Sequence, residues 1–363
     1  MTDGESLTYW LRLTLIPGIG GETQRKLLAA FGLPEAVFSV GRSALRGVIG
    51  DKACSLLLDA ENESLIASAR AWAQEPDQHI ITLADPEYPR ALLEIPDPPT
   101  LLYVRGQFDL LNCTTLAIVG SRNPTVQGIQ NAERFASAFA DAGLVIASGL
   151  ALGIDAAAHR GALAATGHTV AFIGTGIDRI YPARNKELAL EIAARGAIVS
   201  EFPIGTPVSA ANFPRRNRLI SGIARGVLVV EAAIQSGSLI TARLGGEQGR
   251  EVFAVPGSIH SPQSKGCHKL IKQGAKLVES AQDVLEELNM CTPSIVTSAV
   301  ADDADRLPHG LLSLMGFDPC GLDELAERSG LTADSLSVIL LNLELDGKVA
   351  NLPGGRYQQL FKN

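Results

Sequence analysis

The sequence has few aromatic residues, few cysteines and no long apolar run. Among its 363 residues, 5% are aromatic and five are cysteine, spread without any Cys-x-x-Cys pair. This pattern is typical of reduced thiols, so we expect neither a disulfide framework nor a metal site. No stretch approaches the ~20 uncharged residues that cross a bilayer, and the acidic start at residues 1–5 is unlike the basic start of a signal peptide. We therefore expect a cytoplasmic protein without a membrane span.

Two phosphate-binding signatures are also missing. The chain reads Gly-Ser-Arg-Asn-Pro at 120–124, after the first strand of a predicted sheet, instead of Gly-x-Gly-x-x-Gly. No Gly-x-x-x-x-Gly-Lys-Ser/Thr occurs anywhere. Dinucleotide binding and nucleoside triphosphate hydrolysis are therefore disfavoured, and we expect no cofactor. Asp155 and His159 have the spacing of an acid–base pair on a helix, but they lack a nearby nucleophile, which favours a structural role.

Positive charge is scarce overall and concentrated in one region. The net charge is −8, yet residues 213–275 hold nine Lys or Arg and three acids. A protein that bound polyanions through its bulk charge would not have this distribution. Any affinity for nucleic acid must come from a focused site.

The segment at 213–222 places arginines at a predicted helix start. Pro214 suits a first helical position, and the apolar spacing that follows predicts a core-facing stripe. Cations are disfavoured at a helix N-terminus by roughly 0.3 to 1 kcal/mol each, whereas anions are favoured there. Arg215, Arg218 and Arg225 are spaced to share one face. The segment predicts an anion site, and pairing of its arginines with nearby carboxylates is an open alternative.

The chain divides into four predicted parts. Residues 1–75 have helical periodicity, and Gly-Ile-Gly at 18–20 predicts a SAM or helix-hairpin-helix-like turn or, equally, a plain turn in a small bundle. Residues 76–288 are expected to form an extended Rossmann-like domain. A linker is predicted at 289–305 and a winged-helix domain at 306–363, with Thr332 as a helix N-cap.

The central part predicts an α/β fold with a doubly wound, mainly parallel sheet. Apolar runs suited to buried strands alternate with helical runs, at residues 115–119, 144–147, 169–173, 197–200, 226–230, 251–255 and 276–278. Ligands of such sheets gather beyond the carboxyl ends of the strands. Small, polar and basic residues follow each of these strands, so we expect them to form one anion-binding crest.

The predicted crest residues combine close backbone approach, hydrogen-bond donors and positive charge. They are Gly120, Ser121, Arg122, Ser148, Gly149, Thr175, Gly176, Phe213, Arg215, Arg216, Asn217, Arg218, Ser236, Gly237, Ser238 and Lys265. Phe213 could stack on a base, as rings do in single-strand sites, or could pack in the core beside the helix start. Nothing in the set predicts catalysis.

The winged-helix domain lacks the positive charge expected of a domain that binds in a groove of duplex DNA. Its candidate recognition run at 332–344 has no Lys or Arg, and residues 305–363 hold eight acids and five bases. Because phosphate neutralisation dominates duplex affinity, a protein-contact role is favoured.

Several motifs together resemble one bacterial family, DNA-processing protein A (DprA, also Smf). They include Gly-Ser-Arg at 120–122, Ser-Gly-Leu-Ala-Leu-Gly-Ile-Asp at 148–155, Phe-Pro-Arg-Arg-Asn-Arg-Leu-Ile at 213–220 and Val-Pro-Gly at 255–257. The resemblance implies a non-enzymatic protein that binds single-stranded DNA during natural transformation, protects it and loads the RecA recombinase. It also implies a homodimer formed by the Rossmann-like domain. Single-stranded-DNA-binding protein is a further candidate partner.

The chain differs from the family's usual motif at one position. A second class of function also remains possible for this sequence. Where the family often has Asn, this sequence has His268, which leaves the contact there undefined. The alternative is a nucleotide-processing enzyme like the Rossmann-like phosphoribohydrolases. Their Pro-Gly-Gly-x-Gly-Thr loop is replaced here by Ala-Ala-Ile-Gln-Ser-Gly-Ser at 232–238.

Overall fold

The computed structural model describes residues 4–165, 167–290, 308–316 and 318–360. Most of the predicted linker lies outside these residues. The N-terminal helices are α1 (Gly4–Thr14), α2 (Gly21–Phe31), α3 (Pro34–Ser39), α4 (Arg42–Leu58) and α5 (Glu63–Trp72). The glycine turn predicted near residue 18 does join α1 to α2, and Gly18 adopts a φ of 88°, which a side chain would disfavour.

Within the described residues, the central sheet has nine strands, in the order β1-β2-β6-β5-β4-β3-β7-β8-β9. Strands β3 to β9 run parallel to one another, as the sequence predicts. They are β3 (Thr115–Val119), β4 (Val145–Ser148), β5 (Thr169–Phe172), β6 (Ala197–Ser200), β7 (Gly226–Val229), β8 (Glu251–Ala254) and β9 (Lys276–Leu277). Strands β1 (Gln78–Thr82) and β2 (Leu101–Gly106) extend the sheet antiparallel beyond β6.

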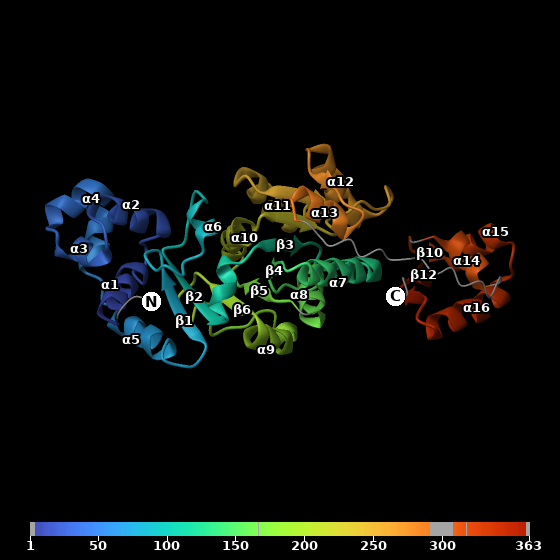
Figure 1. The fold of residues 1–363 in the computed structure, drawn as a ribbon, viewed down its shortest axis with the longest axis horizontal. Helices are drawn as coiled ribbons and strands as arrows, with labels where there is room; N and C mark the ends of the chain where they lie inside the picture. Colours follow the sequence, from blue (N-terminus) through green and yellow to red (C-terminus); the bar gives the residue numbers. More distant parts are fainter. Residues whose placement is uncertain (1–3, 166, 291–307, 317, 361–363) are drawn as a thin grey trace.

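Helices cover both faces of this sheet (Figure 1). One face packs on α10 (Asn212–Ile223), α11 (Ser238–Glu247) and α12 (Lys265–Lys272), joined by α6 (Arg90–Leu93). The other packs on α7 (Val126–Asp141), α8 (Ile154–Ala164), α9 (Lys186–Arg195) and α13 (Ala281–Glu287). Short 3₁₀ turns lie at Phe108–Asn112, Ala183–Asn185 and Pro262–Ser264. Successive side chains of the buried strands alternate between the two faces, which explains their continuous apolar runs.

The N-terminal helices share a hydrophobic core with the sheet. Trp10 and Leu11 of α1 and Ile66 of α5 cluster with Tyr103 of β2 and Ile198 of β6. A second cluster lies wholly among the N-terminal helices. In Figure 1 these helices (blue) lie against β1 and β2 at one edge of the sheet. Residues 4–72 are therefore docked on the central domain.

The C-terminal region forms a small winged helix with its own core. Its elements are α14 (Pro308–Met315), β10 (Cys320–Gly321), α15 (Leu322–Ser329), α16 (Ala333–Leu345), β11 (Val349–Leu352) and β12 (Arg356–Gln359). The Thr332 side chain accepts a hydrogen bond from the Ser335 backbone N–H, which confirms the predicted N-cap. Strand β10 was not predicted. No helix in the described ranges combines the length and apolarity needed to span a bilayer.

Candidate nucleic-acid interface

A cleft opens where the strand order reverses direction. The chain runs from β3 outward through β4, β5 and β6, then returns to place β7 on the other side of β3. Loops after β3 and β7 diverge at this point, and α10 closes the third side. The resulting cleft has a volume of about 620 Å³. Its position is the usual ligand site of a doubly wound sheet.

Many of the predicted crest residues line this cleft. They are Gly120, Ser121 and Arg122 after β3, Phe213, Arg216 and Asn217 of α10, and Ser236, Gly237 and Ser238 after β7. Gly120 allows the loops to meet closely, because a Cβ there would lie 2.7 Å from the Ile154 side chain and 2.9 Å from the Glu231 carbonyl oxygen. Segments far apart in sequence thus form one surface, as expected.

Arg122 and Phe213 form the exposed centre of the cleft. The Arg122 guanidinium carbon lies 5.5 Å from the centroid of the Phe213 ring, within cation–π range. Arg122 is exposed, and no ion pair within the described residues neutralises it. The ring of Tyr181, which is 47% exposed, lies 6.0 Å from that of Phe213 at an angle of 38°. One uncompensated cation and two accessible rings therefore lie together.

Arg216 lies at the base of the cleft and is structural. It is 4% exposed, and its Nη1 donates to the carbonyl oxygens of Gly149 and Phe172, the latter at 2.5 Å. Its Nε donates to Asn217 Oδ1 at 3.1 Å. Gly149 is required here, because a Cβ would lie 2.2 Å from Arg216 Nη1. The free charge that the sequence pattern predicts at Arg216 is thus used to join the ends of β4 and β5.

Arg215 and Arg218 face away from this cleft. Arg218 Nη2 lies 2.5 Å from Glu201 Oε2, and its Nε lies 3.0 Å from Asp97 Oδ2. Arg215 lies 3.8 Å from the same Glu201 oxygen, with its side chain 56% exposed. Both arginines line a second cleft, which the N-terminal glycine turn also borders. The alternative that these arginines pair with nearby carboxylates is therefore correct for Arg218.

The remaining predicted residues shape the rim without presenting side chains to the cleft. Ser148 Oγ donates to the Ile118 carbonyl at 2.6 Å, and Thr175 Oγ1 donates to the Arg179 carbonyl at 2.6 Å. Gly176 is buried in the same turn. Lys265 lies in a separate hollow at the β9 edge and donates to the Ile259 carbonyl. Arg225 lies beyond the end of α10, so it does not share a face with Arg215 and Arg218 as the spacing predicts.

Several residues of the cleft were not predicted from the sequence. Asn123, Gln235 and Gln263 line the cleft, and Gln263 Nε2 donates to the Asn123 carbonyl at 3.1 Å. Tyr181 reaches Phe213 from the loop after β5. Asn123 and Gln235 lie within the post-strand loops that the pattern singles out. Tyr181 belongs to a Tyr-Pro motif at 181–182 that resembles the family's pattern, but its contact with Phe213 was not predicted.

Asp155 borders the cleft and is 8% exposed, whereas His159 is fully buried. The Thr169 hydroxyl donates to the Ile146 carbonyl, so His159 Nδ1, 2.7 Å from Thr169 Oγ1, carries the ring proton. Burial lowers the pKa of His159 to about 3, and the Arg216 charge acts in the same direction. Burial raises the pKa of Asp155, while Arg216 opposes that shift. No group of three His, Cys, Asp or Glu side chains in the described ranges is placed to hold a metal ion.

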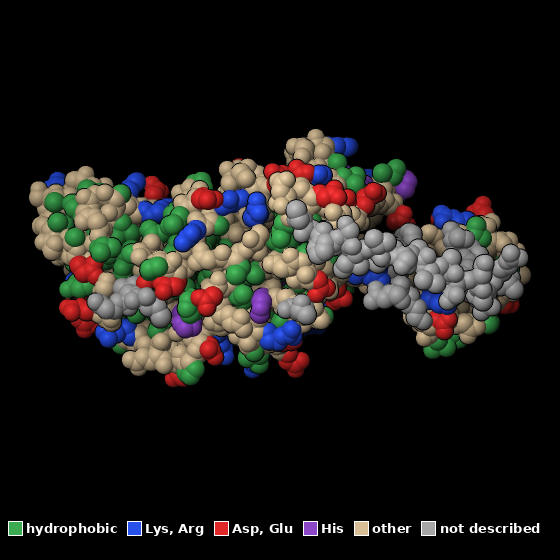
Figure 2. Space-filling model, viewed as in Figure 1, with side chains coloured by type: hydrophobic (Ala, Val, Ile, Leu, Met, Phe, Trp, Pro, Cys, Tyr) green, Lys and Arg blue, Asp and Glu red, His purple; other side chains and the backbone are tan. Residues whose placement is uncertain are grey.

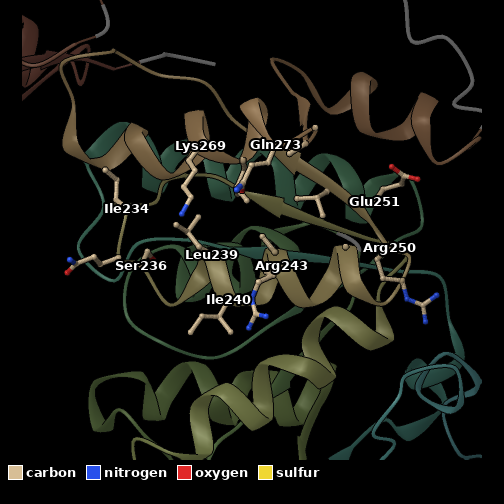
Figure 3. A pocket seen from close by; sticks show the side chains of 16 residues that line it. Ile234, Ser236, Leu239, Ile240, Arg243, Arg250, Glu251, Lys269 and Gln273 are labelled. Atoms are coloured by element: carbon tan, nitrogen blue, oxygen red, sulfur yellow. The ribbon is translucent and has the colours of Figure 1, made fainter.

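A further hollow adjoins the cleft between α11 and α12. Figure 3 shows Leu239, Ile240 and Arg243 of α11 opposite Lys269 and Gln273 of α12. The two cavities share Gln235, Ser236 and Ile240 in their linings. The loop after β7 therefore separates two connected hollows.

The fold and the cleft define an extended Rossmann-like protein with a cationic, aromatic cleft at the switch point. Comparison with known proteins agrees with this class. Residues 79–289 match the family described as DNA recombination-mediator protein A, and residues 297–355 match the DprA winged helix domain. The chain belongs to the DNA recombination-mediator protein A family.

Relatives and solved structures resemble the chain over most of its length. Protein Smf of Escherichia coli (strain K12) is 43% identical over 299 residues, covering 80% of each chain. Protein Smf of Synechocystis sp. is 33% identical and covers 97% of this chain and 98% of the relative. The X-ray structure of DNA processing protein A from Streptococcus pneumoniae has a TM-score of 0.70 and 37% identity, covering 79% of this chain and 99% of that one.

A second solved structure is described in terms of DNA binding. DNA processing protein A from Helicobacter pylori, described for its single-stranded DNA binding mode, has a TM-score of 0.53 and 32% identity. It covers 58% of this chain and 96% of that one.

Proposed function

We propose that this protein binds single-stranded DNA in the cleft at the switch point. The observation that carries the proposal is the exposed cation of Arg122 beside the rings of Phe213 and Tyr181. Single-strand sites combine a backbone-attracting charge with rings on which bases stack. The binding described for the Helicobacter pylori relative supports it. Lys and Arg are scattered among Asp and Glu on the face shown in Figure 2, so affinity depends on the focused site.

In this proposal, only some of the predicted crest residues contact DNA. Arg122, Phe213, Asn217 and the Ser236–Ser238 loop contact DNA, while Arg216 and Gly149 hold the cleft floor. Ser148, Thr175 and Gly176 shape the rim. Arg215, with more than half of its side chain exposed, contributes long-range attraction from the neighbouring face.

A titration tests this proposal directly. Affinity for single strands and for duplexes is measured at several salt concentrations, and the slope for single strands is about −0.7 per phosphate neutralised. Arg122→Glu is expected to abolish binding of single strands without changing the thermal midpoint, because Arg122 is exposed. Arg215→Glu is expected to weaken binding and lower the slope. Unchanged affinity in Arg122→Glu would overturn the proposal.

We further propose that the bound strand is DNA taken up in natural transformation, which the protein protects and passes to the RecA recombinase. The family's description as a recombination mediator supports this role. The test is RecA filament growth on DNA already coated with single-stranded-DNA-binding protein. Wild-type protein should accelerate growth, and Arg122→Glu should not. Equal acceleration by both would refute a role for the cleft.

No catalytic step is proposed. His159 is fully buried and hydrogen-bonded to Thr169, and Asp155, which borders the cleft, accepts the Ala151 N–H. The phosphoribohydrolase alternative predicts base release from nucleoside monophosphates, and incubation with each monophosphate decides between the two functions.

We propose that the chain forms a homodimer through the β9 edge of the sheet domain. Among the described residues strand β9 pairs with β8 alone, and Ile234, Ile259 and Leu277, which line one hollow at this edge, are 59%, 66% and 43% exposed. Contiguous exposed apolar groups at an open strand edge favour association. Ile259→Glu should convert a dimer into a monomer in analytical ultracentrifugation. A monomeric wild type would refute the proposal.

The winged-helix domain, proposed at residues 306–363, contacts protein in preference to duplex DNA. Helix α16 exposes Val338, Leu341 and Leu345 at 62%, 56% and 78%. These residues recur on one helical face, where a DNA reader would carry Lys or Arg. Val338→Ser with Leu341→Ser should leave single-strand affinity unchanged and weaken RecA loading.

A further inference from the structure

We propose that the single strand continues from the switch-point cleft into the hollow between α11 and α12, and that Lys269 binds its phosphates there. This inference rests on the proposed single-strand binding and adds a second contact surface for the same ligand. The hollow, called here the α11–α12 groove, has a volume of about 660 Å³. Its occupant is the DNA strand itself.

Continuity of the two cavities is the first argument. Gln235, Ser236 and Ile240 border both the cleft and the groove, so a chain leaving the cleft past the Ser236 loop enters the groove directly. From there the groove follows α11 past Ala242 and Arg243 to Gly246. The ten residues of α11 span about 15 Å, which accommodates roughly two to four more nucleotides.

The chemistry of the lining is the second argument. Leu239 lies opposite Lys269 (Figure 3), and Ile240 also lines the groove; apolar surface beside a cation accepts bases and phosphates together. Lys269 is exposed and forms no ion pair within the described residues. Arg243 is held by Glu247 at 2.8 Å, but both side chains are more than half exposed, so a phosphate can replace that partner at little cost.

The far end of the groove limits the path. Arg250 is fixed there by Glu94 at 2.9 Å and by the carbonyl oxygens of Ala91 and Gly222. Beside it Glu251 is exposed and would repel a phosphate. The strand therefore ends its contact near Gly246.

The chain offers matched variants for a test. Lys269 and Lys272 both lie on α12, but only Lys269 lines the groove, while both border the hollow at the β9 edge. Gly246 lines the groove, and no atom lies within 4 Å of the position that its Cβ would take. Gly246→Glu and Gly246→Lys therefore place opposite charges at the same position. Both Glu and Lys favour the helical conformation more than Gly does, so neither change should destabilise α11.

The experiment measures affinity for oligothymidylates of increasing length. Wild-type affinity should keep rising beyond the length that fills the cleft. Lys269→Glu and Gly246→Glu should weaken long strands by about threefold to tenfold and leave short strands unchanged, and Lys269→Glu should reduce the salt slope for long strands by about 0.7. Gly246→Lys should tighten long strands, and Lys272→Glu should have no effect. Both lysines border the proposed dimer edge, so the comparison is made between variants that sediment as the wild type does. Thermal midpoints report folding.

Two outcomes separate this inference from the proposed function. If Arg122→Glu abolishes binding at every length while Lys269→Glu and the Gly246 pair change nothing, the groove proposal is overturned and the cleft stands. If Arg122→Glu leaves short strands bound, single-strand binding in the cleft is itself refuted. A loss in Lys272→Glu equal to that in Lys269→Glu would show nonspecific attraction to α12 and would also overturn the groove.

Discussion

The two sides of α10 carry similar arginines that meet very different surroundings. On the cleft side, Arg216 is buried against the carbonyl groups of Gly149 and Phe172 with the Asp155 carboxyl nearby, and Arg122 is exposed without an ion pair in the described residues. On the other side, Arg218 lies between the carboxylates of Glu201 and Asp97, and Arg25 of the N-terminal domain reaches the same Asp97. On the cleft side Arg122 forms no ion pair among the described residues, whereas on the other side Arg25, Arg215 and Arg218 all contact the carboxylates of Glu201 or Asp97.

This difference assigns Arg122 on the cleft side to DNA binding and the arginines on the other side to contacts between α10 and the N-terminal helices. The exposed guanidinium of Arg122 has no ion pair in the described residues, so it can attract a phosphate to the cleft. Cations paired with carboxylates lose most of their field, and their contacts instead join α10 to the N-terminal helices. The arginine motif therefore serves two purposes, and substitutions on each side should have different consequences.

The largest effect is expected from Arg216→Met. This change removes the guanidinium bridge to Gly149 and Phe172 and leaves Asp155 buried without its neighbouring cation. Breaking a buried charge pair in this way costs about 3 to 5 kcal/mol of unfolding free energy. Chemical denaturation measures the loss, and Arg122→Met, at an exposed position, is the matched control with almost no change.

A double variant tests whether the unpaired Asp155 carboxylate causes part of this loss of stability. Asp155→Asn in the Arg216→Met background removes the unpaired carboxylate, so part of the lost stability should return. If Arg216→Met is as stable as the Arg122 control, the bonding described for the cleft floor is wrong.

The next effect concerns the aromatic part of the cleft side. Phe213→Ala should weaken single-strand binding by about 1 to 3 kcal/mol, because a stacked base loses its ring. Phe213→Tyr should retain most affinity, and Tyr181→Ala should cost less than Phe213→Ala. The ring on the other side, Phe202, is 4% exposed, so Phe202→Leu should lower stability and leave affinity unchanged. Fluorescence anisotropy with labelled oligonucleotides distinguishes these outcomes.

The sequence predicted the elements better than it predicted where side chains point. The apolar spacing of Leu219, Ile220 and Ile223 identified the buried face of α10 correctly. Neighbouring residues of a helix differ in direction by about 100°, so Arg216 diverges from Arg215 and Arg218, and the partners of all three come from loops distant in sequence. The contribution of Tyr181 and the antiparallel addition of β1 and β2 likewise depend on tertiary packing that periodicity does not encode.

A pH effect is expected from the buried histidine on the cleft side. His159 is fully buried with a pKa of about 3, against an ordinary value of 6.5. Between these values the unfolded chain binds a proton that the folded protein does not, so stability should fall as pH drops below 6.5, by about 1.4 kcal/mol per unit. The stability difference between wild type and His159→Gln, measured by denaturation from pH 7.5 downward, isolates this slope. Parallel curves would contradict the burial of a neutral imidazole.

The smallest effect is expected on the other side, at the contact with the N-terminal helices. Arg25→Gln removes the pair with Asp97 and the hydrogen bond to the Pro98 carbonyl. The two side chains are 21% and 50% exposed, so the loss should be at most about 1 kcal/mol, and it should shrink in high salt. Single-strand affinity should not change, because the cleft keeps Arg122 and Phe213. Denaturation at two salt concentrations, with Lys26→Gln on the exposed face of α2 as control, measures the effect. A drop in affinity with unchanged stability would show that the two sides of α10 are coupled, and the separation of binding from assembly would then fail.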